Sequence, residues 1–228
     1  MHVGVTHWLG MEFIELSAEA APGATARDQT DGLFAAFSDV LGDLDLTLAD
    51  SLRSRLFGRD RGARDDASDV RRETLAGPAR AATSSYIAPG IFASDAKVAM
   101  DLIARRPGPG LEKAIRENEP PRLPCRYLTC GPLIVLSGQT AVLPNLDVQL
   151  KTDILPRITE YLAEAGSSWK QVVQTTCYLH TSQSPDHLRA LFSEVVPVMP
   201  QRFEIRFVEG YSVEGKLVEV EVTALREF

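Results

Sequence analysis

The chain has 228 residues, a hydrophobic content of 44% and a formal net charge of −7. This length suits two small domains, and the negative charge argues against nucleic-acid binding, which depends on clustered Lys and Arg. The first residues lack a signal-peptide pattern, and no stretch approaches the roughly 20 apolar residues of a membrane helix. We therefore expect a cytoplasmic protein without membrane attachment, whose partner is a small molecule.

An apolar pattern near the N-terminus recurs in the second half of the chain. Residues 33–41 have the i, i+1, i+4, i+7, i+8 spacing of one buried helix stripe, and residues 154–162 repeat it at an offset of 121. Three further pairs of segments recur at offsets of 121, 122 and 120: Leu48 to Phe57 with Trp169 to Tyr178, Pro78-Ala79-Arg80 with Pro200-Gln201-Arg202, and residues 97–104 with 217–224. A drift this small predicts two copies of one unit.

A segment rich in proline and glycine separates the two copies. It begins with Arg-Pro-Gly-Pro-Gly after Arg105 and ends with Pro120-Pro121-Arg122-Leu123-Pro124, a composition that ends helices and strands. The charged stretch between these ends is long enough for one or two helical turns. We predict an N-terminal lobe at 1–105, a linker at 106–125 and a C-terminal lobe at 126–228.

The C-terminal copy predicts the order strand, strand, helix, strand, helix, strand, strand. Apolar and β-branched runs predict strands, and Gly166 and Pro185 mark the end of one helix and the start of the next. The expected ranges are strands at 131–139, 172–179, 202–208 and 217–222, and helices at 147–165 and 185–195. The N-terminal copy follows the same plan from Gly10. Two helices on one face of a mostly antiparallel sheet make an α+β fold.

Several short motifs follow one another in the C-terminal copy: Ser137-Gly138-Gln139, Val172 to Thr176, Pro200-Gln201-Arg202 and Val218 to Ala224. In order and spacing they resemble the Rid (YjgF/YER057c/UK114) family over residues 126–226, and more weakly over residues 8–105. The resemblance implies two tandem chorismate-mutase-like lobes and ligand clefts between neighbouring units. It also implies hydrolysis of enamines or imines without a cofactor. We expect a homo-oligomer, most simply a trimer of two-lobe chains.

Arg202 is the predicted anchor for a substrate carboxylate. It follows a proline and enters a strand, and a guanidinium fork suits a carboxylate bidentately. An ordinary surface arginine is the simpler interpretation of the residue alone. The family resemblance favours the binding role, as does the recurrence of Arg80 in the other copy, and two arginines would suit a dicarboxylate.

Glu219 is the predicted proton carrier. It alternates with Val218 and Val220, so its side chain leaves the apolar face of the strand. The pattern also fits the solvated side of an amphipathic strand, for Glu219 and for Glu221. The resemblance implies a carboxyl group that orients water or moves a proton, which requires a pKa that partial burial can raise. The matching residue of the N-terminal copy is Ala99.

The remaining predicted site residues come from both copies. Ser137 is expected to contact the ligand through its hydroxyl or backbone, whereas no histidine stands at the spacing of a nucleophilic triad. Tyr127 opens the C-terminal copy and is a predicted substrate contact. Glu204 follows Arg202 by two residues and would compete with a substrate carboxylate. Glu19 stands in place of the family's glutamine, and either replaces the missing carboxylate of its copy or faces water.

Cysteine and histidine spacings give no metal or redox signature. Cys125 and Cys130 lack CxxC spacing, and no two histidines are four residues apart. Cys177 fits a small core residue. We therefore predict neither a metal nor an organic cofactor.

The leading hypothesis is a deaminase that uses no cofactor. Arg202, with Arg80 of a neighbouring lobe, would hold a carboxylated enamine or imine while Glu219 manages water and proton, releasing ammonia. An aminomuconate-type dicarboxylate of aromatic-ring degradation is the favoured substrate. The alternatives are a chorismatase-like enol-ether hydrolase and a module without catalysis that senses ligands or stabilises proteins, which Ala99 and Glu204 favour.

Overall fold

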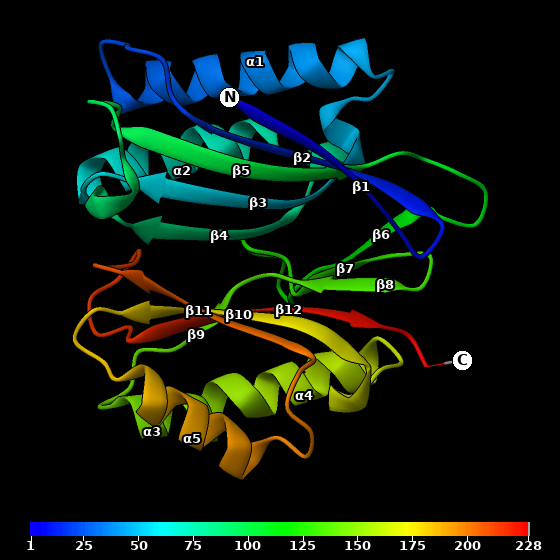
Figure 1. Ribbon diagram of the computed structural model, residues 1–228, viewed down its shortest axis with the longest axis vertical. Helices are drawn as coiled ribbons and strands as arrows, with labels where there is room; N and C mark the ends of the chain where they lie inside the picture. The colour runs from blue at the N-terminus through cyan, green and yellow to red at the C-terminus, as the bar shows by residue number, and fades with distance from the viewer. Residues whose placement is uncertain (228) are drawn as a thin grey trace. The chain divides into compact units, whose positions relative to one another are not determined.

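The computed structural model describes residues 1–227, which fold as two compact units that divide between Glu112 and Lys113 (Figure 1). In each unit the helices lie on one face of a sheet, and a separate hydrophobic core fills the space between them. The predicted α+β class with tandem lobes is confirmed. Within the described residues, no helix is long and apolar enough to cross a membrane.

Unit 1 contains a five-stranded sheet with the strand order β1-β2-β5-β3-β4. The strands are β1 (His2–Trp8), β2 (Met11–Glu19), β3 (Ser51–Gly58), β4 (Ala82–Ile87) and β5 (Val98–Arg105). The helices are α1 (Ala26–Asp43) and α2 (Arg61–Thr74), with short 3-10 turns η1 (Leu48–Asp50), η2 (Gly77–Ala79) and η3 (Pro89–Ile91). Strands β3 and β4 are parallel, and the other neighbours are antiparallel.

The start of this unit differs from the prediction, because β1 precedes Gly10. Leu9 and Gly10 form the turn between β1 and β2, with φ angles of 55° and 71°. Gly10 adopts the left-handed conformation without steric cost. The residue therefore marks the first hairpin rather than the beginning of the sheet.

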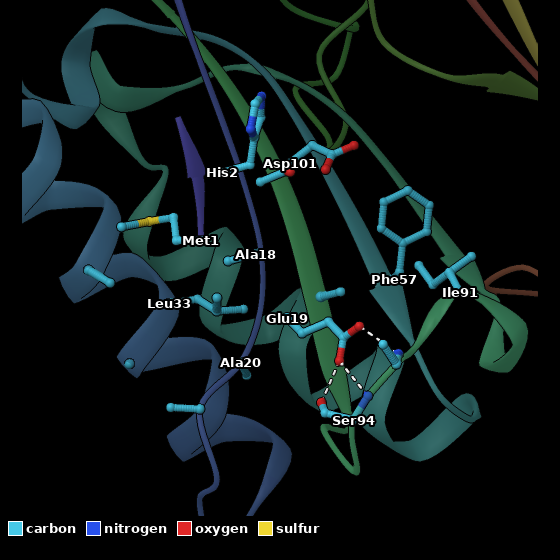
Figure 2. Close-up of a pocket in the computed structure, with 16 residues that line it drawn as sticks. Met1, His2, Ala18, Glu19, Ala20, Leu33, Phe57, Ile91, Ser94 and Asp101 are labelled. Atoms are coloured by element: carbon cyan, nitrogen blue, oxygen red, sulfur yellow. Dashed lines mark hydrogen bonds between the residues drawn. The ribbon is translucent and has the colours of Figure 1, made fainter. Parts of the chain in front are cut away.

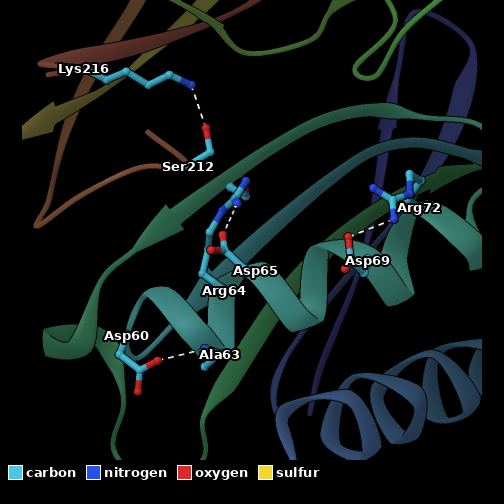
Figure 3. Close-up of polar contacts among 9 residues, drawn as sticks. Asp60, Ala63, Arg64, Asp65, Asp69, Arg72, Ser212 and Lys216 are labelled. Carbon is cyan, nitrogen blue, oxygen red and sulfur yellow. Dashed lines mark hydrogen bonds and ion pairs between the residues drawn. The ribbon is translucent and has the colours of Figure 1, made fainter. Parts of the chain in front are cut away.

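Helix α2 shows how local sequence starts a helix here. Asp60 accepts a hydrogen bond from the Ala63 backbone N–H at 2.8 Å, and Arg72 pairs with Asp69 one turn earlier at 2.9 Å (Figure 3). An aspartate at the N-cap satisfies one of the backbone donors that a helix start leaves without a partner. The buried residues Ala63, Ala67 and Val70 then face the sheet.

Unit 2 has a seven-stranded sheet with the order β11-β10-β12-β8-β7-β6, and β9 pairs with β12. The strands are β6 (Lys113–Arg116), β7 (Tyr127–Cys130), β8 (Leu133–Leu136), β9 (Gln139–Thr140), β10 (Val172–His180), β11 (Arg202–Val208) and β12 (Val218–Leu225). The helical segments are α3 (Leu146–Gln149), the π-helical turn η4 (Leu150–Ile154), α4 (Leu155–Glu164), the 3-10 turn η5 (Trp169–Gln171) and α5 (Pro185–Val195). The charged stretch for which helical turns were expected is strand β6.

A buried glutamine fastens the first helix of each lobe to the segment before the last strand. Gln29 accepts a hydrogen bond from the backbone N–H of Lys97 at 2.8 Å, and Gln149 accepts one from Leu217 at 2.9 Å. Gln149 also donates to the carbonyl oxygens of Leu143 and Gly215, at 2.9 and 2.6 Å. The two glutamines stand 120 residues apart, and each precedes the helix stripe of its lobe. The repeat therefore begins before the stripes, with an offset of 120 rather than the 121 of the stripes.

We expect Gln149→Leu to lower the free energy of unfolding by about 1–3 kcal/mol for each buried polar group that loses its partner. Leucine keeps a similar volume but offers neither an acceptor to the Leu217 N–H nor a donor to the two carbonyl groups. Urea unfolding measures the effect. The matched control is Gln171→Leu in η5, and equal stability of both variants would contradict a fastening role for Gln149.

The change of offset from 120 to 121 lies in the π-helical turn η4. A π turn widens the helix and absorbs one inserted residue, whereas α1 continues as a regular helix at the matching place. The offset of 121 then holds through β3 and β10. Both strands even share one irregularity of register, at Ser51/Arg53 and at Val172/Gln174. The insertion leaves the helix stripe and the following strand intact.

Strand register corrects one predicted correspondence, that of Arg80 with Arg202. Arg53 of β3 pairs with Ala82, while its counterpart Gln174 of β10 pairs with Arg202. Ala82 therefore occupies the position of Arg202. Arg80 lies two residues earlier, between η2 and β4. Both segments read Pro-x-Arg, but the loops before β4 and β11 differ in length. The two arginines therefore do not occupy matching positions.

Candidate functional site

Glu219 occupies the middle of the unit 2 sheet. It pairs with Tyr178 of β10, and the counterpart pair in unit 1 is Phe57 with Ala99, as the sequence predicts. Its neighbours Val218 and Val220 belong to the core beneath the helices, so the Glu219 side chain leaves the opposite face of the sheet. Glu219 is 6% exposed, which rules out the solvated-strand interpretation for this carboxylate.

Glu221 lies two residues further along β12 on the same face, and it is 2% exposed. The solvated-strand interpretation is therefore wrong for this residue too. A buried carboxylate is costly unless it is paired or hydrogen-bonded, so two of them on one sheet face mark a polar site within unit 2.

The Glu219 carboxylate lies directly against the backbone of Gly138. A Cβ atom at Gly138 would stand 2.0 Å from Glu219 Oε1, so a glycine is required for this close approach. Gly138 belongs to a β-bulge. Val135 and Gln139 are four residues apart, whereas their partners on β12, Thr223 and Val220, are three residues apart. The Ser-Gly-Gln motif thus shapes the backbone around Glu219.

Ser137 supports the same bulge from inside the protein. Its hydroxyl lies 3.6 Å from the sulfur of Cys125, and its carbonyl oxygen accepts a hydrogen bond from Gln139 Nε2 at 2.8 Å. Ser137 is 1% exposed. These contacts favour a positioning role over direct contact with a ligand.

Arg202 and Glu204 form an ion pair at the start of β11. Glu204 also contacts Arg206 at 3.4 Å, and β11 is an edge strand of the sheet. The Arg202 side chain is 67% exposed. Glu204 therefore pairs with the guanidinium that the sequence predicts as the anchor for a substrate carboxylate.

Tyr127 packs in the hydrophobic core of unit 2. Its ring centroid lies 6.3 Å from that of Tyr161, and burial raises the pKa of its phenol. Tyr161 rather than Tyr127 reaches the cavity described next.

A cavity of about 260 Å³ adjoins the Ser-Gly-Gln motif in unit 2. Four of its described lining residues are cationic and none is a carboxylate. The lining comprises Asn118, Arg122, Leu123, Pro124, Cys125, Arg126, Gly138, Gln139, Thr140, Arg157, Tyr161 and Lys216. Glu219 contacts Gly138 but is not among these residues. The lining is therefore rich in positively charged groups, which favours an anion over a cation.

Arg126 is held in place on two sides. Its guanidinium donates to Glu164 at 3.2 Å and lies over the Tyr161 ring at 5.3 Å from the centroid. Glu164 also binds Arg116 of β6 at 2.5 Å. The carboxylate and the aromatic face together pre-organise one arginine at the wall of the cavity.

Arg157 and Lys216 complete the cationic wall. Arg157 pairs with Asp153 and donates to the Thr140 carbonyl at 3.4 Å, while Lys216 donates to the Ser212 hydroxyl at 2.7 Å (Figure 3). Burial lowers the pKa of Arg157, and the positive charge of Arg122 lowers it further. An anion in the cavity would relieve that repulsion between like charges.

Sequence reasoning missed these four cations. Arg122 and Arg126 flank Pro124-Cys125 in a segment predicted as a linker and its end, and Arg157 stands one helical turn before Tyr161. The available signal in the sequence was the pair of arginines on either side of Pro124, in a segment rich in proline. No periodic pattern in the sequence connects these arginines with Lys216.

Glu19 of unit 1 binds a turn of its own lobe. Its carboxylate accepts hydrogen bonds from the backbone N–H groups of Ala93 and Ser94, at 2.7 and 3.0 Å, and from the Ser94 hydroxyl (Figure 2). These bonds lower the pKa of Glu19. Glu19 pairs in register with Ala99, so an ionised carboxylate stands beside the position that Glu219 fills in unit 2.

Among residues 1–227, no group of three His, Cys, Asp or Glu side chains could hold a metal ion. The three cysteines are buried and unbridged, and burial raises the pKa of the Cys177 thiol.

Residues 125–226 match the sequence profile of the family described as Endoribonuclease L-PSP. The C-terminal lobe belongs to the Rid family. Across both lobes, the chain is similar to a crystal structure of a chorismatase, with a TM-score of 0.69 and 15% identity over 96% of this chain and 78% of that one. At this identity the likeness shows a shared two-lobe fold.

Rid-family structures of one lobe match about half of the chain. A YjgF-family protein from Neisseria meningitidis is 20% identical over 52% of this chain and 98% of that one, with a TM-score of 0.45. A YjgF/YER057c/UK114-family protein from Mycobacterium tuberculosis is 24% identical over 50% and 99%, with a TM-score of 0.43. No curated protein sequence matches the chain.

Proposed function

We propose that the chain is a cytoplasmic, cofactor-free hydrolase that acts on a small dicarboxylate at the C-terminal lobe. The cavity lined by Arg122, Arg126, Arg157 and Lys216 carries this proposal. Guanidinium groups bind carboxylates bidentately, and several cations around one cavity suit two carboxylates on one molecule. Its volume of about 260 Å³ lies below the ~300–1,000 Å³ of sites for drug-sized ligands, which favours a small substrate.

The proposed chemistry is water addition to an electron-rich double bond next to a carboxylate. Glu219 lies against Gly138 of the cavity wall, and in this proposal it reaches past that glycine to the substrate. It gives a proton to the terminal carbon of the C=C bond, and water then adds to the cationic carbon that bears the oxygen or nitrogen substituent. One water proton returns to Glu219, and the other leaves with the alcohol or ammonia as the C–O or C–N bond breaks. The remaining product is a 2-oxo acid.

We place an enol ether first among the substrates, because the two-lobe fold is shared with a chorismatase across 96% of the chain. A carboxylated enamine or imine of the aminomuconate type is the second candidate, since the Rid family resemblance implies such substrates. Both use the same cavity and the same proton carrier, and they differ in the leaving group.

The deciding experiment is a substrate panel. Purified protein is incubated with dicarboxylate enol ethers and with dicarboxylate enamines, and 2-oxo acid and ammonia are measured separately. Release of 2-oxo acid alone supports the enol ether, and release of both supports the deaminase. If no member of the panel releases 2-oxo acid or ammonia, the result would favour a ligand-binding module without catalysis.

Arg122→Gln is expected to raise KM roughly tenfold or more with little change in kcat. A charge anchor contacts the substrate in both ground and transition states, so its loss weakens binding uniformly. The matched control is Arg206→Gln, which removes the same charge from the half-exposed partner of Glu204. A KM that shifts equally in both variants would instead indicate a general effect of net charge.

We also expect self-association, most simply a trimer of chains. Arg202 lies exposed on edge strand β11, and in this proposal it and Arg80 contribute to sites of neighbouring chains. Light scattering at micromolar concentration measures the assembly. A strict monomer would contradict the expectation and would remove Arg202 and Arg80 from the proposed site.

A further inference from the structure

Strand β1 is an edge strand of the unit 1 sheet, because the strand order is β1-β2-β5-β3-β4 (Figure 1). It pairs with β2 along one side, and none of the described residues forms a backbone hydrogen bond with its other side. All of its residues are exposed except Gly4, which is half-buried. An edge strand of this kind exposes a row of N–H and C=O groups that can pair with another chain.

The turn between β1 and β2 determines which backbone groups of β1 point outward. Leu9 and Gly10 form a two-residue turn in which both φ angles are positive, and such a turn closes with a hydrogen-bonded pair. That pair is Trp8 with Met11. Hydrogen-bonded pairs alternate with non-hydrogen-bonded pairs along an antiparallel ladder, so every second residue of β1 bonds to β2.

The remaining residues of β1 direct their backbone groups to the free edge. His7 pairs in register with Glu12, whose carbonyl oxygen points away from β1 and accepts a hydrogen bond from the Arg106 N–H at 2.9 Å. His7 and Glu12 are therefore a non-hydrogen-bonded pair. By the same alternation, Val5 and Val3 direct their N–H and C=O groups outward as well.

The exposed apolar side chains of unit 1 are concentrated along this strand. Among the described residues of the unit, the large exposed hydrophobic residues are Met1, Val3, Val5, Trp8, Leu9 and Ile91. All but Ile91 lie within the first nine residues of the sequence. Exposed apolar groups that gather in one place are typical of an interaction surface.

Strand β1 lacks the charged residues and prolines with which proteins usually protect a free edge. His2–Trp8 contains no Lys, Arg, Asp, Glu or Pro. By contrast, edge strand β11 carries Arg202, Glu204 and Arg206, and edge strand β6 carries Lys113 and Arg116. The chain has a net charge of −7, but two copies that meet at β1 bring together no acidic residues of this strand.

We propose that β1 pairs with β1 of a second copy of the chain, antiparallel and with a two-fold axis at Val5. In this register Val5 lies opposite the partner's Val5, and Val3 lies opposite His7 of the partner subunit. The pairing uses every outward N–H and C=O group of Val3, Val5 and His7. A shift by two residues would place His7 opposite Met1, or Val3 opposite Leu9, and both of these residues lie outside the strand. A second copy is therefore the occupant that this edge fits.

The pairing has two-fold symmetry, so it requires an even number of chains in the assembly. Together with the trimer expected above, it gives a hexamer, and without that trimer it gives a dimer. It involves β1 alone and none of the residues of the cationic cavity. It therefore stands or fails separately from the hydrolase proposed for unit 2.

The test compares the mass of the assembly in the full-length wild type, Val5→Pro and Val5→Ile by light scattering. Proline removes the outward N–H of Val5, which β2 does not use, whereas isoleucine keeps that N–H and the β-branched side chain. At about 100 μM, where weak association is populated, we expect an even number of chains in wild type and Val5→Ile, and half that mass in Val5→Pro. An odd number of chains in wild type, or an unchanged mass in folded Val5→Pro, would overturn the proposal.

A thermal melt checks the fold of Val5→Pro. If this variant does not fold, Val5→Lys replaces it, because the pairing would place two lysines directly opposite each other at the axis. The matched control is Thr6→Lys, which adds the same charge on the other face of β1, opposite Gly4 of the partner subunit. We expect half the wild-type mass for Val5→Lys and the wild-type mass for Thr6→Lys. Equal masses for the two lysine variants would contradict the pairing.

Amide hydrogen exchange, measured residue by residue, tests the register. The amides of Val3, Val5 and His7 should be protected at high protein concentration and lose that protection on dilution, because only the second copy bonds to them. The amides of Gly4 and Thr6 should stay protected at both concentrations, since they bond to β2. Exchange along β1 that does not change with protein concentration would place any interface elsewhere and refute the proposal.

Discussion

The Glu219→Gln variant is expected to lose about 10²–10⁴-fold in kcat, with little change in KM for the substrate identified by the panel. Glutamine fills the same space against Gly138 but carries no carboxyl proton. Because Glu219 is 6% exposed, bulk water has little access to replace it as a proton donor. Steady-state kinetics together with a thermal melt separate lost chemistry from lost folding.

The control for this variant is Glu209→Gln, which changes an exposed carboxylate of the same unit. It should retain wild-type kinetics, since a solvated charge on the surface contributes little to the chemistry of a buried carboxylate. If Glu219→Gln keeps wild-type turnover, the proton carrier lies elsewhere. Glu221 would then be the next candidate, because it is 2% exposed and stands on the same face of β12.

The sequence predicted the fold well where apolar periodicity is strong. The helix stripe at 33–41, its repeat at 154–162 and the closing strand of each lobe all proved correct, because each side chain of these stripes faces a core. The edge strands β1 and β6 were missed. Their residues are exposed or only half-buried, so neither strand has the apolar alternation on which strand prediction depends.

The candidate site could be predicted only in part. Alternation along β12 showed that Glu219 leaves the core face, but it carries no information on what covers that face. The cationic cavity combines Arg122 and Arg126 from an irregular segment with Arg157 from α4 and Lys216 from a loop. Only the folded chain brings these residues together, and no local spacing encodes such a cluster.

The Gly138→Ala variant is expected to lower the free energy of unfolding by about 1–3 kcal/mol and to lower kcat nearly as much as Glu219→Gln. The new Cβ would stand 2.0 Å from Glu219 Oε1, so either the bulge or the carboxylate must move. The matched control is Gly42→Ala in α1, where an added Cβ meets nothing within 4 Å and should leave stability equal or higher. Urea unfolding and steady-state kinetics measure the two effects.

A double variant separates steric strain from catalysis at this position. In Gly138→Ala with Glu219→Ala, the carboxylate that collides with the new Cβ is gone, so stability should return toward that of Glu219→Ala alone. Activity should stay lost, because the proton carrier is absent. Additive losses of stability would mean that the alanine strains the bulge by itself. Recovered activity would mean that Glu219 obstructs the site rather than serving it, because the double variant has no carboxylate at this position.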